Sequence, residues 1–88
     1  MTIHTPAATS LSYNVIQAVK RYSDELKGHD PINLYQLVME EIEAPLLQWV
    51  MEHCKYNQSR AAVMLGISRG TLRTKLRQYF DEKYLGNR

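Results

Sequence analysis

A chain of 88 residues with 44% hydrophobic content builds one small globular domain and is too short for a second core. It contains no apolar run long enough for a membrane span or a signal peptide, and its single cysteine excludes an intrachain disulfide, so we expect a cytoplasmic protein. The net charge of +2 combines residues 1–54 at −4 with residues 55–88 at +6, a split typical of a polyanion-binding end or, alternatively, of a basic face that only meets solvent.

A short arm and a first helix are predicted at the start of the chain. Residues 1–10 are rich in Thr, Ala and Ser and lack a helical period, which predicts a flexible arm. From Leu11 to Leu26 apolar residues recur at steps of three and four, so we expect one helix over residues 12–27. Gly28 follows, a residue suited to the left-handed conformation that closes a helix.

A second, longer helix is predicted over residues 33–56. Asp30 and Asn33 are candidate caps, and Pro31 suits a first helical turn. Pro45 lies inside the apolar pattern, which continues through it in phase. We therefore expect one helix with a kink, and the alternative is two separate helices broken just before the proline.

The apolar arc of this second helix is wider than the first helix can cover. The surplus surface is expected to meet a second copy of the chain, which gives an intertwined helical homodimer. The residues assigned to this interface are Leu34, Val38, Ile42, Leu46, Trp49 and Val50.

Two short helices are predicted in the basic half of the chain, over residues 58–65 and 69–79. Asn57 and Ser68 stand directly before them as N-cap residues, and Gly66 suits a tight turn between them. Two short helices joined by a turn that contains glycine predict a helix-turn-helix.

The core positions and the charges of this segment agree with that prediction. Ala62 is small enough for the crossing of the two helices, and Ile67 and Leu72 are apolar residues that can fill the core of the motif. From Lys55 to Phe80 the chain carries six positive and no negative side chains. A basic second helix of this kind fits the major groove of DNA. The alternative is an αα-hairpin whose basic face contacts only solvent.

The segment NQSRAAVMLGISRGTLRTKLRQYF, with LYQLV and PLL before it, resembles the Fis family of bacterial nucleoid-associated proteins. The resemblance covers residues 11–79, although NQSRAA and GISRGTLR also resemble the DNA-binding ends of NtrC-type activators. It implies an all-α chain of four helices that forms an intertwined homodimer, with dimerisation helices over residues 11–56 and a helix-turn-helix over residues 57–80. It also implies double-stranded DNA as the partner, bound at degenerate sites and bent, in a nucleoid-associated transcriptional regulator.

The resemblance also implies a role for individual residues of the helix-turn-helix. Arg69 would be the main reader of a base, bidentate to a guanine, with Ser68 beside it and Thr74 further along the same outward face. The residues that would contact DNA phosphates are Asn57, Ser59, Arg60, Thr71, Arg73, Lys75 and Arg77.

The chain departs from the family pattern at several positions. Ser68 and Thr74 stand where the best-known members have Asn and Lys, which predicts altered base selectivity and phosphate affinity. The arm over residues 1–10 is shorter than the hairpin with which the family stimulates DNA invertases. Residues 81–88 run past the usual end of the family, and we expect this C-terminal tail to continue the last helix. Tyr56 replaces a common glycine in the turn through which the family contacts RNA polymerase, a further candidate partner.

No catalytic or metal-binding arrangement is expected. His53 and Cys54 are helix neighbours whose side chains diverge by about 100°, so they cannot act on one atom. No His, Cys or carboxylate cluster has metal-ligand spacing, and no glycine-rich phosphate loop is present. We therefore expect no enzyme and no cofactor. Two alternatives to a nucleoid-associated regulator stay open: a regulator of a few operators, and a helical protein-interaction module.

Overall fold

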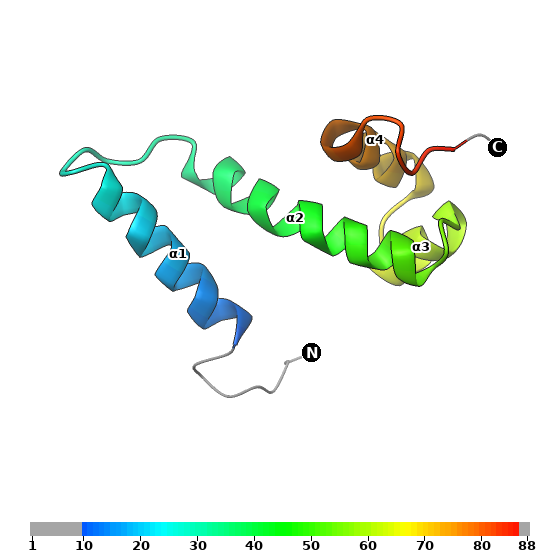
Figure 1. Ribbon diagram of the computed structural model, residues 1–88, viewed down its shortest axis with the longest axis horizontal. Coiled ribbons are helices and arrows are strands. Elements are labelled where there is room, and N and C mark those ends of the chain that lie inside the picture. The colour runs from blue at the N-terminus through cyan, green and yellow to red at the C-terminus, as the bar shows by residue number, and fades with distance from the viewer. Residues whose placement is uncertain (1–9, 87–88) are drawn as a thin grey trace. The chain divides into compact units, whose positions relative to one another are not determined.

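The computed structural model describes residues 10–86, and within that range the chain forms helices and no strand. Four helices follow one another from the blue to the red end of the chain (Figure 1): α1 (Leu11–Glu25), α2 (Leu34–His53), α3 (Gln58–Leu65) and α4 (Arg69–Phe80). The predicted all-α class is therefore confirmed. The chain divides into an N-terminal unit, residues 1–39, and a C-terminal unit, residues 40–88, with the boundary inside α2.

Helix α1 begins one residue earlier than predicted, after a side-chain cap, and ends just before the predicted glycine. The Ser10 side chain caps its start by accepting a hydrogen bond from the Tyr13 amide at 3.1 Å. At its end Lys27 and Gly28 both have positive φ, 53° and 94°, so the helix stops two residues earlier than predicted. The predicted arm, apart from Ser10, lies outside the described residues.

Helix α2 runs unbroken through Pro45, so the alternative of two separate helices is wrong. Asn33 stands before its first residue, but its φ of 59° is left-handed rather than the extended backbone of an N-cap residue. The helix ends at His53, earlier than predicted, because Lys55 and Tyr56 both take a positive φ. The Tyr56 amide donates to the Met51 carbonyl at 2.8 Å, which closes the helix end. A kink at Pro45 stays a prediction.

The core of the C-terminal unit is built from one face of α2 and from both later helices. The core residues of α2 recur at steps of three and four, and each core residue of the unit is at most 6% exposed. Half-buried Leu65, Ile67, Tyr79 and Phe80 pack against this core. Its buried members are Leu47, Val50, Met51, Cys54, Ala61, Ala62, Leu72, Leu76, Tyr84 and Leu85.

The C-terminal tail folds back instead of continuing α4, so that prediction is wrong. The helix ends at Phe80, because Asp81 has φ 54° and ψ −120°. The turn carries Tyr84 and Leu85 into the core, where they are only 1% and 6% exposed. Burial of two large apolar side chains is a stronger stabilising effect than a few more helical hydrogen bonds at the end of a chain. Residues 87–88 lie outside the described part of the chain.

The residues assigned to a dimer interface are distributed unevenly between surface and core. Leu46 and Trp49 are 47% and 57% exposed, whereas Leu34, Val38 and Ile42 are half-buried. The remaining member, Val50, is 3% exposed and belongs to the core of its own unit. The exposed apolar side chains of α2 are the stronger candidates for contact with a partner, and the interface role of Val50 stays a prediction.

Candidate nucleic-acid interface

The turn between α3 and α4 has the backbone geometry that a helix-turn-helix requires. Gly66 adopts a left-handed conformation with φ 78° and ψ 28°. Its amide donates to the Ala62 carbonyl at 2.9 Å, and the amide of Ile67 donates to the same carbonyl at 3.1 Å. Both alanines at the helix crossing, Ala61 and Ala62, are buried. The two helices and their glycine turn therefore confirm the predicted motif.

Side-chain caps fix where both helices of the motif start. The Asn57 side chain accepts a hydrogen bond from the Arg60 amide at 3.0 Å, and the Ser68 hydroxyl oxygen accepts one from the Thr71 amide at 3.0 Å. The Ser68 hydroxyl in turn donates to the Thr71 hydroxyl at 2.9 Å. These contacts hold the backbone at the first turn of α4, where Arg69 projects.

Of the three candidate base readers, Arg69 has the most hydrogen-bonding capacity left. It is exposed at the first position of α4, and among the described residues no side chain engages its guanidinium group. Ser68 is occupied as the cap of the helix. The Thr74 hydroxyl donates to the Gly70 carbonyl at 3.1 Å, which leaves it only as an acceptor. The geometry therefore favours Arg69 as the donor to a base edge.

The candidate phosphate ligands fall into two groups. Asn57, Ser59 and Arg60 lie at the start of α3, and all three are exposed. The others lie along α4, where Thr71 and Arg77 are exposed, whereas Arg73 and Lys75 are half-buried. Arg77 has only a long, exposed ion pair with Glu82, at 3.8 Å, so its charge stays accessible.

Lys75 contacts a carboxylate from a distant part of the chain. Its Nζ atom lies 2.9 Å from Oε2 of Glu43 on helix α2. The Tyr79 hydroxyl donates to the other oxygen of this carboxylate at 2.6 Å. The contact balances the charge of Lys75 and joins α4 to α2. Lys75 thus has a partner within its own chain, and its assignment to a DNA phosphate stays a prediction.

The same contacts change the titration of both acidic partners. Hydrogen bonds from Tyr79 and Lys75 lower the pKa of Glu43 below its ordinary value of 4.5. Burial and the hydrogen bond to Glu43 raise the pKa of Tyr79 to about 12. Glu43 is thus held ionised and Tyr79 is held neutral as its donor.

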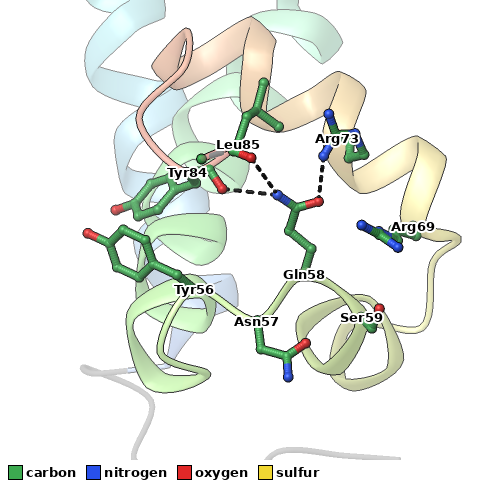
Figure 2. Close-up of a pocket in the computed structure, with 9 residues that line it drawn as sticks. Tyr56, Asn57, Gln58, Ser59, Arg69, Arg73, Tyr84 and Leu85 are labelled. Carbon is green, nitrogen blue, oxygen red and sulfur yellow. Dashed lines mark hydrogen bonds between the residues drawn. The ribbon is translucent and has the colours of Figure 1, made fainter. Parts of the chain in front are cut away.

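A pocket of about 660 Å³ is lined by residues at the start of α3, on α4 and in the C-terminal tail (Figure 2). Four predicted DNA ligands line it: Asn57, Ser59, Arg69 and Arg73. Figure 2 shows the guanidinium groups of Arg69 and Arg73 on the same flank of Gln58. No carboxylate is among the residues that line the pocket, which are Tyr56, Asn57, Gln58, Ser59, Arg69, Arg73, Tyr84, Leu85 and Gly86. Two cations without an acid beside them suit a polyanion.

Sequence reasoning missed Gln58 and the tail as parts of this pocket. Gln58 stands inside the segment that carries the family resemblance, but an uncharged side chain gave no signal of its own. Tyr84 and Leu85 are two consecutive hydrophobic residues near a chain end, and a pair of this kind does not indicate which surface it covers. Gln58, which donates to the backbone carbonyls of both, lies 26 residues from Tyr84 and 27 from Leu85 along the chain.

The pair His53 and Cys54 forms no site. The His53 ring is exposed and stacks on Trp49 with ring centroids 4.7 Å apart, while Cys54 is 1% exposed and its thiol lies 3.9 Å from the sulfur of Met64. Residues 10–86 contain no group of three or more His, Cys, Asp or Glu that could hold a metal ion. Within the same residues, no helix is long and apolar enough to cross a membrane.

Comparisons with known proteins agree with the geometry of the motif. The family model described as "Bacterial regulatory protein, Fis family" matches residues 38–79. The DNA-binding protein Fis of Glaesserella parasuis serovar 5 (strain SH0165) is 58% identical over 69 residues, which are 78% of this chain and 70% of that protein. That of Mannheimia haemolytica is 56% identical over 66 residues, 75% and 67% of the two chains. That of Tolumonas auensis (strain DSM 9187 / NBRC 110442 / TA 4) is 46% identical over 76 residues, 86% and 77%.

Proposed function

Because the chain belongs to the Fis family of bacterial regulatory proteins, we propose that it binds double-stranded DNA as a homodimer and acts as a nucleoid-associated regulator of transcription. The observation that carries this proposal is the pocket in which Arg69 and Arg73 of α4 meet Asn57 and Ser59 at the start of α3. The names of the relatives, DNA-binding protein Fis, support the same ligand.

In this proposal the first turn of α4 enters the major groove and reads a base edge. Arg69 projects from that turn with its donors uncommitted, and a guanidinium group matches the O6 and N7 acceptors of guanine in a bidentate contact. Ser68 directly precedes it and Thr74 follows on the same helix, and both hydroxyl groups already donate within the chain. Neither has the reach of the Asn and Lys of other family members, which supports a readout with Arg69 as its centre.

The start of α3 and the outward side of α4 hold the DNA backbone. The amides in the first turn of α3 and the positive end of its helix dipole favour an anion, and Asn57, Ser59 and Arg60 stand around it. Thr71, Arg73 and Arg77 supply further donors along α4. Phosphate contacts of this kind position the duplex without reading its sequence.

A homodimer would set the distance between two copies of α4. The exposed Leu46 and Trp49 on α2, together with the half-buried Leu34, Val38 and Ile42, are the surface proposed to meet the partner. Two recognition helices held closer than one turn of straight B-DNA bend the duplex, so part of the specificity arises from DNA shape. A contact with RNA polymerase at the turn that holds the exposed Tyr56 belongs to the same proposal.

Salt dependence is the experiment that tests DNA binding. Affinity for a fluorescent duplex is measured by anisotropy over a series of salt concentrations. Log affinity should fall linearly with log salt, with a slope of about 0.9 for each phosphate contacted. A slope near zero would refute binding through the phosphates and leave the protein-interaction module as the better hypothesis.

Paired substitutions separate base reading from phosphate binding. Arg69→Ala should remove the preference for one guanine in each half-site, at a cost of about 1 to 3 kcal/mol per contact. Arg73→Ala should weaken all duplexes alike. Genome-wide mapping of bound DNA then distinguishes a nucleoid protein, with many degenerate sites, from a regulator of a few operators.

A further inference from the structure

Gln58 joins the C-terminal tail to Arg73, a half-buried candidate DNA ligand. Its side-chain Nε2 donates to the carbonyl oxygens of Tyr84 at 3.1 Å and Leu85 at 3.3 Å. Its Oε1 accepts a hydrogen bond from Nη1 of Arg73 at 2.8 Å (Figure 2). One amide group therefore connects the last turn of the chain to a guanidinium group on α4.

The orientation of this amide follows from its partners. Backbone carbonyls accept and never donate, so the nitrogen of the Gln58 amide has to face the tail. The oxygen must then face Arg73, which is a donor only. Arg73 would lose its fixed acceptor if the tail carbonyls moved away, because the amide would be free to rotate.

The tail is held in place by contacts that do not involve Gln58. The Tyr84 ring is buried and meets the rings of Tyr56 and Phe80 edge to face, with centroids 5.0 Å and 5.1 Å apart. Its hydroxyl donates to Oε2 of Glu52 at 3.1 Å. Anchored at α2 and α4 in this way, the tail offers its carbonyls at a fixed position.

We propose that the docked tail, acting through Gln58, positions the guanidinium group of Arg73 for a DNA phosphate. Gln58 is then a positioning residue, and residues 81–86 belong to the DNA-binding unit. The inference rests on the proposed function, because it assigns Arg73 to the DNA backbone.

The chemistry of the contact suits positioning rather than neutralisation. Gln58 is uncharged, so Arg73 keeps its full positive charge, unlike Lys75 beside Glu43. A guanidinium group has five N–H donors, and Arg73 donates one of them to Gln58. The remaining donors stay available to phosphate oxygens. A side chain already held in place loses less conformational freedom on binding, and this strengthens the complex.

The first experiment examines the free protein, without DNA. Relaxation of the Arg73 side-chain Nε–Hε group is measured by 15N NMR in the wild type and in Gln58→Met, which keeps the length of the side chain and removes all three of its hydrogen bonds. Tyr84→Ala releases the tail, and Tyr84→Phe retains the buried ring as its matched control. Gln48→Met, at an exposed position on α2, controls for the added methionine. Arg73 should become more mobile in Gln58→Met and Tyr84→Ala, change less in Tyr84→Phe, which loses only the hydrogen bond to Glu52, and stay unchanged in Gln48→Met.

The second experiment measures affinity for duplex DNA in the same variants. Gln58→Met should weaken binding by roughly three- to tenfold, the range expected for immobilising one long side chain. Its salt slope should equal that of the wild type, because the charge of Arg73 is retained, whereas Arg73→Ala should lower the slope by about 0.9. The double variant Gln58→Met with Arg73→Ala should bind no more weakly than Arg73→Ala alone.

Each result decides the inference. Unchanged Arg73 mobility in Gln58→Met would overturn it, and so would additive effects in the double variant, since Gln58 would then act on DNA or on the fold by itself. If Tyr84→Ala fails to fold, Gln58→Met still decides the outcome. A wild type that binds no duplex would refute the proposed function in the first titration, before any variant is compared, and the NMR result would still report whether Gln58 and the tail order Arg73.

Discussion

Lys75 of α4 and Glu43 of α2 form an ion pair with Nζ and Oε2 2.9 Å apart, and this contact joins the motif to the helix that precedes it. Both side chains are about 30% exposed, so water screens the pair only in part. The Tyr79 hydroxyl adds a hydrogen bond to the same carboxylate. A residue that resemblance assigns to the DNA backbone therefore has a structural partner inside its own chain.

Lys75→Gln should change the salt dependence of DNA binding very little. The charge of Lys75 is already balanced by Glu43. Lys75 is therefore not expected to neutralise a phosphate and release a counterion from the DNA. The slope of log affinity against log salt should stay within error of the wild-type value, while Arg73→Gln, on the same helix, lowers it by about 0.9. A drop of that size in Lys75→Gln would show that the ion pair opens on DNA.

Glu43→Gln should reduce stability at neutral pH and flatten its decline in acid. The pKa of Glu43 is lowered in the folded chain by hydrogen bonds from Tyr79 and Lys75. A carboxyl group whose pKa is lowered by folding stabilises the folded chain at pH values above its ordinary pKa of 4.5. This stabilisation is lost as the pH falls through the pKa of the group in the folded chain. Since both partners are partly exposed, we expect a loss of about 1 kcal/mol at neutral pH.

Urea unfolding followed by circular dichroism, at neutral pH and at steps below pH 4.5, measures this change in the free energy of unfolding. Glu41→Gln, at an exposed position on the same helix, is the control. Equal pH profiles for Glu43→Gln and the wild type would mean that other carboxylates govern the unfolding in acid.

Local chemistry explains why so much of the motif could be predicted from the sequence. The caps Asn57 and Ser68 bond to amides only three residues away, and the left-handed turn needs only Gly66 at the right place. These signals lie within a few residues of the structure they specify, so helices, turn and fold class follow from the chain itself.

The parts that could not be predicted depend on partners distant in the chain. Lys75 and Glu43 are 32 residues apart, and nothing along α4 distinguishes a lysine that faces a carboxylate from one that faces solvent. The burial of Tyr84 and Leu85 could not be predicted, because it depends on a surface formed by residues distant in the chain. Val50 lies on a broad apolar arc of α2, part of which packs into the core and part of which is exposed. The periodicity of the sequence does not distinguish these two parts of the arc.

Two glycines of the motif should respond in opposite directions to alanine. Gly66 has φ 78°, which strains any residue with a Cβ atom, so Gly66→Ala should destabilise the chain by about 1 kcal/mol or more. Gly70 lies inside α4 without positive φ and with nothing within 4 Å of an added Cβ, so Gly70→Ala should stabilise it by up to about 1 kcal/mol.

Thermal and urea unfolding of both variants in parallel measures the two shifts. Gly66→Asn should recover part of the loss, because Asn tolerates the left-handed conformation better than Ala. Equal stability of Gly66→Ala and the wild type would mean that the turn relaxes into another conformation.

Trp49→Lys and Leu46→Lys should dissociate the proposed homodimer without removing the core of the C-terminal unit. Both side chains are about half exposed in the single chain, and a charge on an apolar interface loses its hydration without gaining a partner. Each variant should raise the dimer dissociation constant at least about tenfold. Val50→Ala is the contrasting variant, because Val50 is 3% exposed in its own unit and its truncation should cost about 2 kcal/mol of unfolding free energy.

Sedimentation velocity over a range of protein concentrations measures the association, and circular dichroism measures the helix content of the same samples. Since folding and association of small helical dimers are coupled, the unfolding midpoint of the wild type should rise with concentration, and that of Trp49→Lys should rise less. A dimer that persists in both lysine variants would move the interface away from this face of α2. A wild-type chain that sediments as a stable folded monomer would refute the dimer itself, and with it the spacing of two α4 helices by which the DNA is proposed to bend.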